Sequence, residues 1–203
     1  MIRFRLFSIS FAVSFWAVLL VSFALITSVN GQMYIIICLF CTVFHEFGHL
    51  LMICKYKGKP ESIAINPFEI RINADLSELL LKEEVCIISF GVVFNFLLGI
   101  LTGIFYWLFS CELFLHISIS SLCVGVVNLL PLDSFDGGQL LKLLLSRMLS
   151  QSAVSRILSV ISIIFIIPLV IIGIAVLFVS QYNFSVLFIA LFLISIYISK
   201  ELR

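Results

Sequence analysis

Residues 33–54 read MYIIICLFCTVFHEFGHLLMIC, an apolar run whose only charged or imidazole side chains are His45, Glu46 and His49. About 20 mostly apolar residues are enough to cross the hydrocarbon core of a membrane as a helix. Ionisable side chains at that depth are costly, and they are functional candidates by default. The stretch therefore predicts a membrane-spanning helix that carries a chemical site.

The composition of the whole chain supports a membrane environment. The 203 residues are 63% hydrophobic and 11% charged, and the mean hydropathy is +1.27. Soluble domains are about 45–50% apolar and about 25% charged. We therefore expect one integral membrane domain over residues 1–203, with the lipid bilayer as its solvent. A net charge of +1 gives no support for a nucleic-acid partner.

Apolar runs of spanning length predict an all-α membrane protein with about six transmembrane helices. Their expected ranges are Leu6–Val29, Met33–Cys54, Val85–Phe109, Leu113–Leu130, Ile157–Val179 and Tyr182–Ile198. After the second helix, residues 62–72 mix β-branched residues in rough alternation with a proline, which predicts a short membrane-associated β element. After the fourth helix, residues 133–156 are expected to form a turn and an amphipathic helix at the membrane surface.

The basic residues predict the orientation of this six-helix arrangement. If the N-terminus is cytoplasmic, every Lys and Arg falls in a cytoplasmic segment, and the three external connections contain none. The basic residues are Arg3, Arg5, Lys55, Lys57, Lys59, Arg71, Lys82, Lys142, Arg147, Arg156, Lys200 and Arg203. An excess of Lys and Arg in cytoplasmic loops is typical of membrane proteins. Both termini are therefore expected in the cytoplasm, and a different number of spans would destroy this agreement.

The residues HEFGH, 45–49, fit the pattern H-E-x-x-H. Positions i and i+4 share one face of a helix, so His45 and His49 could bind one metal ion together. Zinc accepts two imidazoles and a carboxylate and leaves a fourth position open in catalytic sites. A glutamate beside such a site, here Glu46, can act as a general base. The chain has only three histidines, so two of them in one motif favour metal binding over packing.

The third metal ligand is not fixed by spacing. His116 is expected near the external end of the fourth helix, whereas the other two histidines lie toward the cytoplasmic end of the second. Carboxylates at a matching depth come from Asp133 and Asp136, where the chain turns back after Pro131. Either aspartate could complete the site on this argument.

The two motifs together resemble the site-2 protease family of intramembrane zinc metalloproteases. That family pairs H-E-x-x-H with N-x-x-P-x-x-x-x-D-G, and NLLPLDSFDGG, residues 128–138, matches each fixed position of the second motif. The resemblance implies that Asp136 rather than Asp133 is the third zinc ligand. It also implies that Asn128 helps to hold the substrate or to stabilise the oxyanion.

This resemblance covers about residues 33–150, which would form the catalytic core. Weaker similarities after the first motif resemble the sporulation-factor-processing branch of the family. The third helix departs from the family because it reads Ser-Phe-Gly-Val at residues 89–92, without the usual proline, before Asn95. Asn95 is therefore open to two interpretations, a polar group near the metal or a hydrogen bond between helices. Gly99 and Gly103 form G-x-x-x-G, which favours close helix packing.

The expected function is hydrolysis of peptide bonds in membrane-anchored proteins or peptides, near the cytoplasmic side of a bacterial cell membrane. The 203 residues are expected to lack the C-terminal nucleotide-sensing domain of the sporulation branch, so its regulation and substrate are not carried over. The alternative is a metal-binding membrane protein or transporter without hydrolysis. Glu46 counts against that alternative, because a pure binding site needs no general base.

Overall fold

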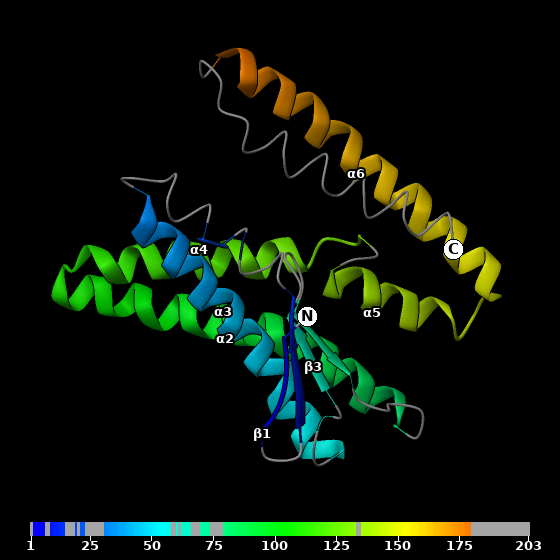
Figure 1. Cartoon of the computed structure of the whole chain (residues 1–203). Helices are drawn as coiled ribbons and strands as arrows, with labels where there is room; N and C mark the ends of the chain where they lie inside the picture. Colours follow the sequence, from blue (N-terminus) through cyan, green and yellow to red (C-terminus); the bar gives the residue numbers. More distant parts are fainter. Residues whose placement is uncertain are drawn as a thin grey trace. The chain divides into compact units, whose positions relative to one another are not determined.

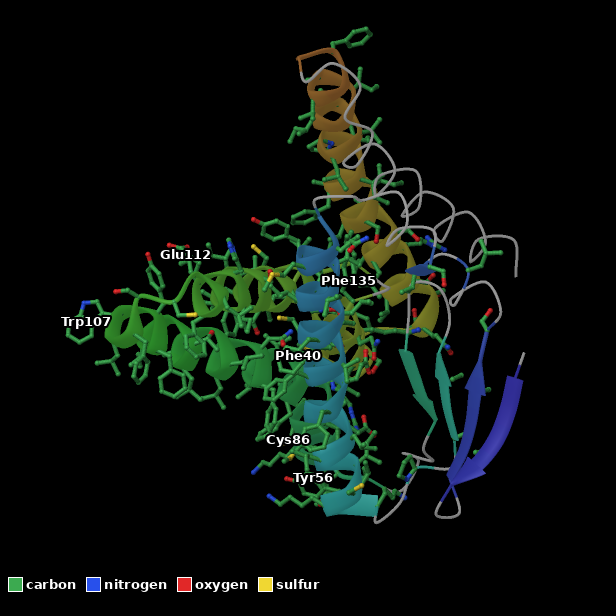
Figure 2. All side chains as sticks on the ribbon, turned by 60° about the vertical axis from the view of Figure 1, so that its left-hand side comes forward. Phe40, Tyr56, Cys86, Trp107, Glu112 and Phe135 are labelled. Carbon is green, nitrogen blue, oxygen red and sulfur yellow. The ribbon has the colours of Figure 1, made fainter. Side chains whose placement is uncertain are left out.

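The computed structural model describes residues 2–6, 9–14, 19, 21–22, 31–57, 60, 62–65, 70–73, 79–132 and 135–179 (Figure 1). The chain divides into two compact units, Met1–Asn128 and Leu129–Arg203. The expectation that residues 1–203 act as one domain stays a prediction.

Within the described residues, the first unit contains the helices α2 (Gln32–Lys57), α3 (Leu81–Phe109) and α4 (Glu112–Asn128). Helices α3 and α4 run side by side, and α2 crosses them (Figure 1). The turn between α3 and α4 is tight because Ser110 adopts a left-handed conformation, with φ 50°, and its N–H donates to the Tyr106 carbonyl at 2.8 Å.

Three described helices are long and apolar enough to cross a membrane, namely Gln32–Lys57, Leu81–Phe109 and Gln151–Val176. They correspond to the second, third and fifth of the predicted spans. The fourth predicted span is α4, an apolar helix of 17 residues, which is about 25 Å long at 1.5 Å per residue. The sixth predicted span, Tyr182–Ile198, lies outside the described residues.

The side chains of the first unit are distributed as lipid solvation requires. Large apolar side chains point outward, including Ile36, Ile100 and Trp107, which are 58%, 57% and 80% exposed. The largest fully buried side chains are instead Asn95, Cys41 and Ser121. Small and polar residues between helices are typical of packing in a membrane, because burial of apolar surface does not drive helix association when the solvent is lipid.

A four-stranded sheet also belongs to the first unit. Its strands are β1 (Ile2–Leu6), β2 (Ile9–Val13), β3 (Ser62–Ile65) and β4 (Ile70–Asn73), in the order β1-β2-β3-β4. Strands β2 and β3 pair in parallel, with Ser10 opposite Ser62, and the other two pairs are antiparallel. That β3 and β4 associate with the membrane stays a prediction.

The prediction that a spanning helix begins at Leu6 is wrong, because residues 9–13 form β2. The physical reason is visible at residues 2–6, where Ile, Phe and Leu alternate with Arg3 and Arg5. Alternation with a period of two favours a strand, and a test for apolar length does not detect it. Most of residues 14–29 lie outside the described part of the chain.

The second unit contains α5 (Asp136–Leu145) and α6 (Gln151–Val179), which continues through Pro168. Its buried core is formed by Leu132 and Ile166, with Leu130, Phe135, Leu169 and Val170 packed against them. Helix α5 follows the turn at the expected position, and Lys142 lies in its last turn.

Candidate metal centre

Two histidines of α2 converge on one point. His45 and His49 lie one helical turn apart, and their Nε2 atoms are 3.1 Å apart. The two rings are nearly perpendicular, with an interplanar angle of 83°. His45 is 3% exposed and His49 is half-buried, so both imidazoles sit among side chains rather than in solvent.

The outer nitrogen of each imidazole has a partner on α3. Nδ1 of His49 lies 2.8 Å from the carbonyl oxygen of Ile87. A carbonyl only accepts, so this nitrogen carries the proton and Nε2 is left with its lone pair. Nδ1 of His45 lies 3.2 Å from Nδ2 of Asn95. Contacts of this kind fix the orientation of metal-binding histidines in proteins.

Glycines allow α3 to approach these histidines closely. A methyl group added at Gly91 would overlap Nε2 of His49 and would lie 2.8 Å from Cε1 of His45. On the facing helix, a methyl group at Gly48 would lie 2.6 Å from the Phe90 carbonyl oxygen. Any side chain at Gly91 would therefore push into the imidazole pair.

The imidazole pair fits a zinc ion. Zn–N bonds of about 2.0–2.1 Å in a tetrahedral site place two nitrogens about 3.3–3.4 Å apart. The observed 3.1 Å between the Nε2 atoms is close to that value. The contact of His49 Nδ1 with the Ile87 carbonyl oxygen is of the kind expected around a metal ligand.

The third histidine does not join the pair. His116 of α4 instead contacts Tyr34 edge to face, with ring centroids 5.0 Å apart. Tyr34 lies near the start of α2, eleven residues before His45. His116 therefore belongs to the packing of α4 against the opposite end of α2, as the depth argument from the sequence indicates.

The two predicted catalytic residues of the first unit lie on different helices. Glu46 follows His45 on α2 and is half-buried. Asn128 is the last residue of α4, and its side-chain NH2 donates to the Val124 carbonyl at 3.0 Å. This bond uses one of the two amide hydrogens, and the second remains to be donated elsewhere.

The predicted third ligand lies at the start of α5 in the second unit. Asp136 is 7% exposed and occupies the first turn of that helix, where the helix dipole stabilises a negative charge. A methyl group at Gly137 would overlap the Leu129 carbonyl oxygen and would lie 2.7 Å from that of Leu130. Only glycine lets the chain fold back so closely after α4. Asp133 lies outside the described residues.

Sequence reasoning missed two residues of this centre, Gly91 and Ser121. Ser121 of α4 is fully buried, and its hydroxyl donates to the backbone carbonyl of Asn95 at 2.9 Å. Neither residue belongs to a motif that indicates chemistry. Their importance comes from contacts between helices, which residue spacing along one helix does not reveal.

Comparison with known proteins identifies a similar family and a similar fold. Residues 107–172 match the model of Peptidase family M50, a segment that contains Asn128 and Asp136 but not the histidine motif. Among solved structures, the fold is similar to the site-2 protease from Methanocaldococcus jannaschii, with a TM-score of 0.72. The predicted resemblance to the site-2 protease family is confirmed.

The similarity to this site-2 protease extends over nearly the whole chain. It covers 95% of this chain and 91% of the other, at 22% sequence identity. None of the curated proteins matches this sequence. At this identity the structural match establishes the fold, and the chemistry has to be argued from the residues of this chain.

Proposed function

We propose that this protein is an intramembrane zinc metalloprotease that cleaves membrane-anchored proteins or peptides. The observation that carries the proposal is the convergence of the His45 and His49 Nε2 atoms, 3.1 Å apart, beside Glu46 on an apolar helix. The family match and the site-2 protease fold support the same reaction class.

His45, His49 and Asp136 would hold the zinc ion. Two imidazoles and one carboxylate make a donor set that is typical of catalytic zinc. Asp136 is proposed as the third ligand because it occupies the aspartate position of N-x-x-P-x-x-x-x-D-G. When bound, zinc would lower the pKa of a water molecule and polarise the carbonyl group of the substrate.

Glu46 is the proposed general base and Asn128 the proposed oxyanion donor. Glu46 accepts a proton from the attacking water, whose oxygen bonds to the carbonyl carbon of the scissile peptide. The remaining amide hydrogen of Asn128 is available to the developing oxyanion. The C–N bond then breaks, and Glu46 returns the proton to the leaving nitrogen.

The site is proposed to face the cytoplasm. Lys55 and Lys57 lie in the last turn of α2, two turns beyond the histidines, and basic residues favour the cytoplasmic side. Strand β1, which contains Arg3 and Arg5, belongs to the same sheet as β3 and β4, which follow α2. The sheet thus gathers basic segments from two parts of the chain, which supports a cytoplasmic N-terminus.

The experiment that tests the proposal compares Glu46→Gln with the wild type. The purified chains are assayed for bound zinc and for cleavage of a co-expressed single-span reporter that is tagged at both ends. We expect Glu46→Gln to keep zinc and to lose about 10²–10⁴-fold in cleavage rate, because only proton transfer is removed. His49→Ala should lose zinc as well as activity.

The alternative function and the ligand assignment give different results. A metal transporter without hydrolysis would cleave no reporter in either form. Cleavage by Glu46→Gln at the normal rate would exclude the proposed base. Loss of zinc in Asp133→Ala, with zinc kept in Asp136→Ala, would overturn the third ligand.

A further inference from the structure

The geometry points to Asn95 as the residue that positions His45 for metal binding. We propose that the Asn95 side-chain oxygen accepts the Nδ1 proton of His45, while Ser121 holds the other end of the amide. The inference rests on the proposed zinc site, and it resolves the two roles that the sequence leaves open for Asn95 in favour of the metal.

The three residues form a continuous chain of contacts through the middle of the first unit. His45 is on α2, Asn95 on α3 and Ser121 on α4, and their side chains are 3%, 0% and 0% exposed. Nδ1 of His45 lies 3.2 Å from the Asn95 amide, whose other end lies 3.4 Å from the Ser121 hydroxyl. Buried polar groups at such depth need complementary donors and acceptors.

Metal binding dictates which atom of Asn95 must face His45. A ligating Nε2 carries no proton, so the neutral imidazole of His45 carries its proton on Nδ1. That N–H needs an acceptor, and the Asn95 amide lies 3.2 Å from it. In the structure the amide nitrogen of Asn95 faces His45. A half turn of the amide about its last side-chain bond puts the oxygen in that place.

The Ser121 hydroxyl favours this orientation of the amide. Its single proton is donated to the Asn95 backbone carbonyl at 2.9 Å. The same proton cannot also form a strong hydrogen bond to the Asn95 side-chain oxygen, which lies 3.4 Å from the hydroxyl oxygen. After the half turn, the amide NH2 faces Ser121 and donates to a lone pair of the hydroxyl, so each group in the chain has a complementary partner.

A role in helix packing alone makes different demands on Asn95. It would require a side chain of the same size and a link between α3 and α4, but no acceptor for His45. Ser118 shows such a purely helix-linking contact, since its hydroxyl donates to the Gly99 carbonyl at 2.7 Å, on the same two helices. Ser118→Ala is therefore the matched control.

The test measures zinc affinity of the full-length chain in detergent, by competition with a chelating dye. Asn95→Leu removes the acceptor at similar volume. We expect zinc affinity to fall about 10–100-fold, as it does when other residues that hydrogen-bond to metal ligands are replaced. Asn95→Asp keeps an acceptor oxygen and should stay within about 3-fold of the wild type. Ser118→Ala should bind zinc as the wild type does.

Each other outcome has a definite meaning. Equal affinity in Asn95→Leu and the wild type would reduce Asn95 to a packing residue. An Asn95→Asp variant as weak as Asn95→Leu would exclude the acceptor role. Absence of zinc binding by the wild type would instead overturn the proposed function, so the two failures are distinguishable.

A second measurement needs no variant. Nitrogen-15 NMR of the zinc-loaded wild type, labelled at histidine, reports which ring nitrogen of His45 carries a proton. We expect a protonated Nδ1 and a metal-bound Nε2. Ligation through Nδ1, with the proton on Nε2, would overturn the inference even if every Asn95 variant failed to fold.

Discussion

The two halves of α3 use similar residues for different purposes. In the first half, Gly91 lies against the imidazoles of α2 and Asn95 contacts His45. In the second half, Gly99 and Gly103 lie against α4, close to Ser118 and Leu122. Both halves combine glycines with buried polar side chains.

The partners of the buried polar groups separate the two halves. Thr102, in the second half, donates its hydroxyl proton to the backbone carbonyl of Leu98 at 2.7 Å. Ser118 of α4, which packs against the second half, donates to the backbone carbonyl of Gly99, also at 2.7 Å. Asn95 reaches a titratable side chain instead. A small-residue motif in a membrane helix therefore indicates close approach, and the group that approaches decides whether it serves packing or chemistry.

The largest effect is expected for Gly91→Ala, which tests the first half. The new methyl group would overlap the His49 ring, and we expect zinc affinity to fall by at least about 10²-fold, the upper end for outer partners. Alanine is the better helix former by about 1 kcal/mol, so helix content should be kept. Zinc titration and circular dichroism measure the two properties, and unchanged zinc binding would contradict the close approach at Gly91.

Gly99→Ala tests the second half and should give the opposite result. Its methyl group would lie 2.7 Å from Cγ and Cδ2 of Leu122, so α3 and α4 would have to separate or Leu122 would have to move. Overpacking of this kind costs about 1–3 kcal/mol. Equilibrium unfolding in mixed micelles should show the loss, while zinc affinity stays unchanged. A fall in zinc affinity as large as that of Gly91→Ala would erase the distinction between the halves.

The smallest effect is expected at the end of the second half. Ser110 holds a left-handed conformation, which costs a residue with a Cβ about 1–2 kcal/mol. Ser110→Gly relieves this cost but makes the unfolded chain more flexible, so the free energy of unfolding should rise by at most about 1 kcal/mol. The same micelle assay measures it, and a clear loss of stability would show that the Ser110 side chain has a role of its own.

Helices α2 and α3 could be predicted well from the sequence. The second and third spans were expected at Met33–Cys54 and Val85–Phe109, and α2 and α3 cover these ranges with extra residues at their ends. Most of the extra residues are polar or charged, such as Lys55 and Lys57. A criterion based on apolar runs ends at the hydrocarbon edge, whereas helical hydrogen bonding continues beyond it.

The N-terminal strands could not be predicted in the same way. Apolar length outweighed the alternation around Arg3 and Arg5, and the pairing of β2 with β3 joins segments separated by α2. The residues of the candidate site likewise differ in how far the sequence predicts them. Spacing predicted that His45 and His49 lie together because both are on one helix, but the contact of His45 with Asn95 depends on how α2 packs against α3.

The parallel pairing of β2 with β3 has a consequence for biogenesis. Ser10 pairs with Ser62, which is synthesised 52 residues later (62 − 10), and α2 lies between them. At about 5–20 residues per second, the first hairpin waits several seconds for its partner strand. During that time α2 is synthesised. The sheet can therefore be completed only after the helix that bears the histidines has been synthesised.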